Sequence, residues 1–128
     1  MTAQKLLDNA LALILTSSSQ TQEYTDHALP LINMLLAETE RHNNMIRKSK
    51  NKEEKTGLFI LSLDDELPCE DELAVTALPN GLCSKLLMDD DDMAKVAYFQ
   101  NQYVAACDAA ATCIFEPVVD VYPKGGDE

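Results

Sequence analysis

The chain has 128 residues, which is enough for one domain built around a single hydrophobic core. Hydrophobic residues make up 46% of it, a share that excludes a wholly disordered protein. Twenty-two acidic residues against ten basic ones give a formal net charge of −12, so the chain is a poor general ligand for nucleic-acid phosphates. The same charge also serves simple solubility, and composition alone leaves that explanation open.

The N-terminus predicts a helix. Thr2 is a suitable N-cap, and the apolar residues between Leu6 and Ile14 fall on one broad face. This run lacks a basic leader and a cleavage site, so we do not interpret it as a signal peptide. The hydroxyl-rich cluster 16–20 should end the helix, because its side chains compete for backbone hydrogen bonds.

A second helix is expected from Thr21 to about Met45 or Arg47, since its apolar residues follow a 3.6-residue period. Pro30 lies inside this pattern and lacks a backbone donor. It should either kink the helix or mark its true first turn.

A basic loop, at about 47–57, follows this helix. Residues 41–55 hold six of the ten basic residues, and no apolar period continues after Ile46. We therefore expect an exposed, mobile loop that Gly57 closes. The apolar run Leu58–Leu63 is too short for an isolated helix and predicts a strand or an extended segment.

A third helix should begin at the acidic residues 70–72 and carry an apolar stripe to Leu86. Pro79 and Gly81 within it should weaken or bend it. The run Asp89–Asp92 is expected to form a loop and the N-cap of a last helix. That helix starts at Met93, and its 105–111 end extends or frays.

The C-terminal segment 114–122 is extended by composition, because Pro117 and Pro123 confine it to a sheet edge or a docking arm. Residues 1–123 should form one domain, and residues 124–128 a disordered tail. The predicted fold is mainly α: a compact bundle of about four helices with a short extended segment or small β element and an extended C-terminal arm.

No catalytic, cofactor or metal site is expected. The Asp89–Asp92 run lacks the alternating ligands and turn glycine of a calcium loop, so a helix-capping turn is favoured. Residues 64–66 could be paired catalytic carboxylates, but nothing specifies a pocket for them. Cys69 precedes a helix without any motif of a nucleophile, and a reduced core thiol is favoured. Glycine-rich phosphate loops are missing from the sequence, and no apolar stretch is long enough to span a membrane.

Charge is distributed unevenly along the chain. Residues 64–92 hold many acids and one base, in contrast to the basic loop. The loop could be an ordinary solvated loop, or it could contact nucleic acid or an acidic protein surface. A basic and an acidic region on one subunit could also pair head-to-side with another copy, and such contacts generate rings when the rotation closes. This hypothesis predicts self-association that is sensitive to salt.

The region 63–104 resembles a known family. It contains Asp65-Glu66-Leu67-Pro68, then Pro79-Asn80-Gly81, the acidic run Asp89–Asp92, and the pair Phe99 and Tyr103, in matching order and spacing. These motifs, with "TAQKLLDNALALI", "ALPLINMLLAE" and the closing "VVDVYP", are similar to head–tail connector proteins from prophages of Gram-positive bacteria. Two departures concern subunit contacts: the family often has an aromatic residue at position 80, and the basic loop looks like an insertion.

The resemblance implies a non-enzymatic virion protein made in the bacterial host cytoplasm. It would form a ring, commonly of about a dozen copies, between the portal and the tail. Its expected partners are copies of itself, the portal protein and tail components, with no cofactor, membrane or small-molecule substrate. DNA would pass through without specific binding, because an acidic lumen repels phosphates.

The side chains that we expect to contact partners come from the basic loop and the C-terminal arm. They are Arg47, Lys48, Lys50, Lys52, Lys55, Phe115, Val118, Val119, Val121 and Tyr122. Two alternatives remain open: another phage morphogenesis part, such as a tail-completion protein, and a cytoplasmic helical protein-binding or regulatory module without a virion role.

Overall fold

The computed structural model describes residues 1–15, 18–90 and 92–113. Within these ranges the chain is mainly α-helical and contains no β-sheet. The elements are α1 (Ala3–Ile14), α2 (Ser18–Glu38), α3 (Glu40–Ser49), α4 (Asp71–Ala74), α5 (Ala77–Leu86), the 3₁₀ turn η1 (Leu87–Asp90) and α6 (Met93–Cys113). The mainly α prediction is confirmed. The predicted arm and tail (114–128) lie outside the described residues.

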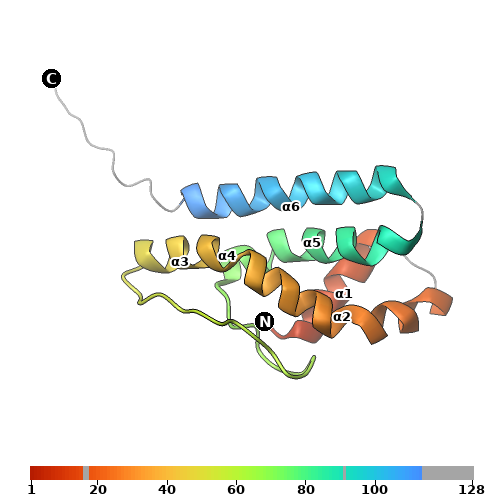
Figure 1. The fold of residues 1–128 in the computed structure, drawn as a ribbon, viewed down its shortest axis with the longest axis horizontal. Helices are drawn as coiled ribbons and strands as arrows, with labels where there is room; N and C mark the ends of the chain where they lie inside the picture. Colours follow the sequence, from red (N-terminus) through yellow and green to blue (C-terminus); the bar gives the residue numbers. More distant parts are fainter. Residues whose placement is uncertain (16–17, 91, 114–128) are drawn as a thin grey trace, which may run out of the picture.

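Six α-helices occur where about four were expected, because two of the predicted helices are interrupted. A small β element is not formed in the described chain, which has one isolated bridge between Thr2 and Glu66. Figure 1 shows α5 enclosed by other helices, with α6 along one edge of the molecule and α2 and α3 along another. Direct contacts join α5 to α1, α2 and α6.

The predicted cap of α1 is confirmed. The Thr2 hydroxyl accepts a hydrogen bond from the backbone N–H of Lys5 at 3.2 Å. The helix ends at Leu15, which adopts a left-handed conformation with φ 57° and is 87% exposed. Leucine is unusual there, because only glycine adopts this conformation without steric cost. Since Ser18 already belongs to α2, the second helix begins three residues earlier than expected.

The second predicted helix is divided at Thr39. Its hydroxyl donates to the carbonyl of Leu35 at 2.8 Å, a bond that bends helices, while the backbone pattern continues through Asn43 N–H to Thr39 O at 2.8 Å. Pro30 lies well inside α2, so the idea that it marks the first turn is wrong. The helical conformation resumes in α3 and reaches Ser49, so the first residues of the predicted basic loop are helical.

The third predicted helix is divided into α4 and α5 rather than bent. In a continuous helix the ring of Pro79 would meet the carbonyl of Val75, four residues earlier. The break at residues 75–76 places Pro79 in the first turn of α5, where it is tolerated. Gly81 then allows close packing: a Cβ atom there would lie 2.7 Å from Leu35 and 2.8 Å from Tyr103.

The last helix begins as expected. Asp92 accepts a hydrogen bond from the backbone N–H of Lys95 at 3.2 Å and so caps α6. One stripe of α6 is buried at helical spacing against the core: Val96, Phe99, Tyr103, Cys107 and Ala111. The helix continues to Cys113, so the alternative that residues 105–111 extend it is confirmed. None of the described helices is long and apolar enough to cross a bilayer.

Between α3 and α4 the chain runs over the surface of α2 and α3. Leu58 and Ile60 are buried, whereas Phe59 and Leu61 are exposed, the alternation of an extended segment. The side-chain amide of Asn33 on α2 satisfies both backbone groups of Ile60. It accepts from the Ile60 N–H at 2.8 Å and donates to the Ile60 carbonyl at 3.0 Å. The extended alternative of the prediction is therefore confirmed.

Candidate interaction surfaces

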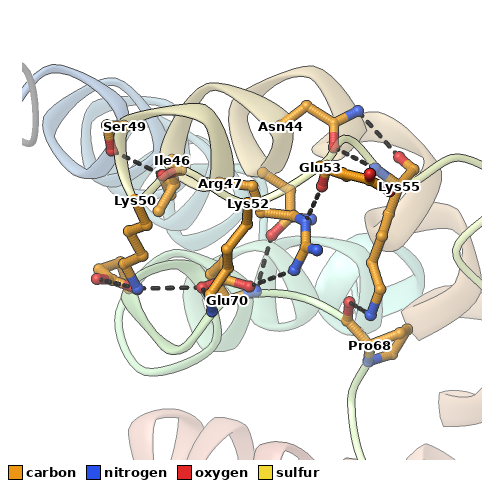
Figure 2. Close-up of polar contacts among 12 residues, drawn as sticks. Asn44, Ile46, Arg47, Ser49, Lys50, Lys52, Glu53, Lys55, Pro68 and Glu70 are labelled. Carbon is orange, nitrogen blue, oxygen red and sulfur yellow. Dashed lines mark hydrogen bonds and ion pairs between the residues drawn. The ribbon is translucent and has the colours of Figure 1, made fainter.

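The basic region closes onto one carboxylate of its own chain. Arg47, Lys50 and Lys52 each place a nitrogen 3.0 Å from a carboxylate oxygen of Glu70, whose side chain is only 9% exposed. Figure 2 shows these three side chains converging on Glu70 from α3 and the segment after it. Lys50 also reaches Glu72 at 2.7 Å. We call these five residues the Glu70 cluster.

Backbone contacts hold the partners of Glu70 in place. Arg47 uses a second nitrogen to donate to the carbonyl of Glu53 at 2.6 Å, which ties the loop to α3. The buried amide oxygen of Asn43 accepts from the backbone N–H of Glu70 at 2.7 Å. The side-chain amide of Asn44 binds both backbone groups of Lys55: it donates to the Lys55 carbonyl at 2.9 Å and accepts from the Lys55 N–H at 2.8 Å (Figure 2). The loop is thus fixed at both ends against α3.

The electrostatics of the cluster favour a permanently ionised Glu70. Burial on its own would raise the pKa of this carboxyl, but hydrogen bonds from Lys52, Lys50 and Arg47 outweigh burial and lower the pKa to about 2. Hydrogen bonding to Glu72 is the main cause that raises the pKa of Lys50. A carboxylate held as an anion at neutral pH cannot exchange protons readily, so the arrangement suits a structural clasp.

The structure therefore assigns different roles to the predicted basic contact residues. Arg47, Lys50 and Lys52 have partners inside the chain. Lys48 remains 68% exposed, with Glu54 at 3.7 Å, and the ammonium of Lys55 lies 3.4 Å from the carbonyl of Pro68. The predicted contact residues of the arm lie outside the described residues: Phe115, Val118, Val119, Val121 and Tyr122.

The acidic residues weighed as chemical groups act as local caps. Asp65 accepts from the backbone N–H groups of Leu61 and Ser62 at 2.9 and 3.1 Å. Glu66 pairs with the N-terminal ammonium at 2.9 Å. In the part of the chain that the structure covers, no three His, Cys, Asp or Glu side chains gather in a way that could hold a metal ion.

The described thiols are buried and protonated. Burial raises the pKa of Cys69 to about 11, and it has the same effect on Cys107, while it raises the pKa of Cys83 to about 12. A thiol with such a pKa supplies little thiolate at neutral pH. Cys83 also donates to the carbonyl of Ala10 at 3.2 Å, as a core residue would.

A small cavity with polar and apolar walls lies between α2 and the end of α5. It holds about 240 Å³ and is bordered by Glu23, His27, Lys85 and Asp90, with the Tyr24 hydroxyl bonded to Asp90. Lys85 turns instead to Glu38, at 2.9 Å. The cavity is smaller than the roughly 300–1,000 Å³ typical of small-molecule sites.

Two exposed apolar surfaces were not foreseen. The first, the apolar groove, lies between α2 and the 58–61 segment and is lined by Leu29, Pro30, Asn33, Met34, Ala37, Leu58 and Phe59. The second, the end patch, joins the last turn of α1 to the first turns of α6 and contains Leu13, Ile14, Leu15, Ala94, Lys95, Tyr98 and Phe99. The continuous apolar run Leu58–Leu61 was the signal in the sequence that could have located the groove, because an extended segment on a surface buries only every second side chain.

A separate, charged groove lies along α3. Its lining includes Arg41, Asn44, Met45 and Lys48 on the helix and Glu54 and Thr56 on the facing segment. Arg41 forms no ion pair with any described residue. The charged groove is therefore lined by two bases, Arg41 and Lys48, and two acids, Glu40 and Glu54.

No protein-family model matches this chain, and no curated protein or solved structure is similar enough to count as a match.

Proposed function

We propose that this chain is a structural subunit of a tailed-phage virion, a head–tail connector that assembles as a ring between portal and tail. The observation that carries the proposal is the pair of apolar surfaces at different places on one small acidic protein. Phe59 is 61% exposed in the groove, and Tyr98 and Leu15 are 57% and 87% exposed in the end patch. Apolar patches of this kind mark protein–protein contacts.

The position of the two surfaces favours head-to-tail assembly. In Figure 1 the segment that carries Phe59 runs along the α2–α3 edge, whereas α6 follows the opposite edge and meets the end of α1 at one end of the molecule. Two different surfaces that meet on successive copies form a heterologous contact, and such contacts close into rings when the rotation permits. The resemblance of residues 63–104 to connector proteins supplies the particular assembly.

The Glu70 cluster affects how the charged side chains of the chain would interact with DNA. Three basic side chains are paired with Glu70 and Glu72 within the chain, so they are less available to bind phosphates. An acidic ring would let DNA slide through its lumen without gripping the phosphates. The basic-to-acidic pairing that could have joined two copies is satisfied within one copy instead.

The proposal can be tested on virions. Mass spectrometry of particles purified after induction of a lysogen that carries the gene should detect this chain in a fixed ratio to the portal protein. Negative-stain images of the purified protein with that portal should show rings attached to it. Particles that assemble and infect normally without the chain would refute the connector role.

A further inference from the structure

The outward face of α6 carries very little charge. Only two of the 21 residues of this helix are charged, Lys95 and Asp108, whereas 25% of the whole chain is. In Figure 1 α6 forms one edge of the molecule, and none of the other described helices lies outside it. Tyr98 is 57% exposed there, in a row with Ala94 and Ala105 at helical spacing. A solvated helix face usually carries charged side chains, so this face has the composition of a contact surface.

The two charges are placed for pairing with a second α6 that runs in the opposite direction. Lys95 lies in the first turn of the helix and Asp108 thirteen residues later, and their side chains are 59% and 68% exposed. In an antiparallel pair Lys95 of each copy comes level with Asp108 of the other, whereas a parallel pair would bring like charges together. Opposed helix dipoles favour the same orientation. We infer that the outward faces of α6 from two copies of this chain pack together, antiparallel, around a two-fold axis.

The register that the charges define also matches the side chains between them. A two-fold axis that brings the two charges level crosses α6 between Asn101 and Gln102. It places the ring of Tyr98 opposite Ala105 of the other copy, so a large side chain meets a small one. The amide side chains at the centre can both donate and accept hydrogen bonds, which suits a contact between identical surfaces. Small residues in the row let the two helices approach to about 8–10 Å.

Both charges are free to turn toward a second copy. Lys95 lies 3.9 Å from Asp92 in the preceding turn, and Asp108 lies 3.3 Å from the imidazole of His42. These contacts are loose and largely in solvent, so they contribute little within one copy. The same two side chains can therefore form the contacts across the axis without breaking a strong pair.

The contact is small, so we expect it to be reversible. A helix of 21 residues is about 31 Å long, and one face of it lies at the lower end of specific interfaces. The dissociation constant should be on the order of micromolar. The inference goes beyond the proposed function and does not depend on it. Because Tyr98 and Lys95 also belong to the end patch, a paired copy cannot offer that patch to a ring neighbour, and the pair is the free form of the chain.

An exchange of charges in the full-length chain tests the orientation and the register. Lys95→Asp alone brings acids level with each other across the axis, and Asp108→Lys alone brings lysines level with each other. We expect each variant to dimerise about tenfold more weakly in sedimentation equilibrium, with an unchanged circular dichroism spectrum. An equimolar mixture of the two variants should recover the native dissociation constant, because both pairs of opposite charges form again between unlike copies.

A charge at the centre of the face provides a second measurement. Ala105→Glu brings a carboxylate against Tyr98 and should weaken the dimer at least as much. Ala37→Glu is the matched control, because it adds the same charge to an exposed helical alanine in the apolar groove, and it should leave dimerisation unchanged.

Three results would overturn the inference. They are a native chain that stays monomeric up to about millimolar concentration, a mixture of the charge variants that does not recover, and a dimer that Ala37→Glu weakens more than Ala105→Glu does. The last result would show that the apolar groove joins the copies instead. None of them bears on the presence of the chain in virions, so the connector role is tested separately.

Discussion

Replacement of Glu70 by glutamine tests whether the cluster stabilises the fold. The change keeps the shape of the side chain but removes the charge that Arg47, Lys50 and Lys52 share. In the native protein the pKa of Glu70 is lowered from 4.5 to about 2. Each pKa unit corresponds to about 1.4 kcal/mol, so the shift is worth roughly 3.5 kcal/mol as an upper figure. Lys52 is 47% exposed, and solvent screening of its contribution reduces the expected loss to about 2–3 kcal/mol.

The sign of the pH dependence follows from the lowered pKa. The ionised carboxylate stabilises the folded state fully above the unfolded pKa of about 4.5, and this contribution disappears as the pH falls toward about 2. We therefore expect Glu70→Gln to be less stable than the native chain at neutral pH. The difference should shrink steadily between pH 4.5 and pH 2.

Urea unfolding followed by far-UV circular dichroism provides the measurement. Glu54→Gln is the matched control, because it removes the same charge at a side chain that pairs with Lys48 and is 55% exposed. Exposed ion pairs contribute about 0–1 kcal/mol, so this control should unfold almost like the native chain. Equal losses in the two variants, or a loss in Glu70→Gln that does not vary with pH, would refute the stabilising role of the cluster.

Three further changes probe other features of the fold. Gly81→Ala should lower the free energy of unfolding by about 1–2 kcal/mol, because crowding against Tyr103 costs more than alanine gains in helix propensity. A variant that is more stable in urea titrations would contradict the close packing. Leu15→Gly should instead raise stability by about 1 kcal/mol, because glycine accepts the left-handed conformation and the leucine is exposed; a lower thermal midpoint would be the opposing result. Asn33→Ala should cost about 1–3 kcal/mol and speed amide hydrogen exchange at Ile60, whereas unchanged exchange there would show that the two amide bonds do not hold the segment.

Local signals in the sequence identified the starts of α1, α4 and α6 and the extended segment. Thr2 and Asp92 act as caps because a hydroxyl or carboxylate close to a helix start can reach its free N–H groups, and this depends only on nearby residues. The short apolar run Leu58–Leu63 likewise indicated an extended segment, because it is too short to form an isolated helix. Pro79 signalled a disruption, but the sequence did not show whether the helix would bend or break.

Contacts between distant residues could not be predicted in this way. Lys52 and Glu70 are eighteen positions apart, and the charges alone allow pairing within one chain or between two. The buried side chain of Asn43 decides the matter, because it accepts from the N–H of Glu70 and so holds Glu70 against α3. The close packing of Tyr103 against Gly81 depends on how α6 lies relative to α5, which no local sequence pattern predicts.

The enclosure of α5 has a consequence for how this molecule can change over time. Eight of its ten residues are buried, and of the remaining two Lys85 is already engaged with Glu38. Selection for shape must therefore fall heavily on α5, where even an added methyl group is costly. The exposed side chains of α2, α3 and α6 are less constrained by packing, so new binding specificities could evolve there while the fold stays the same.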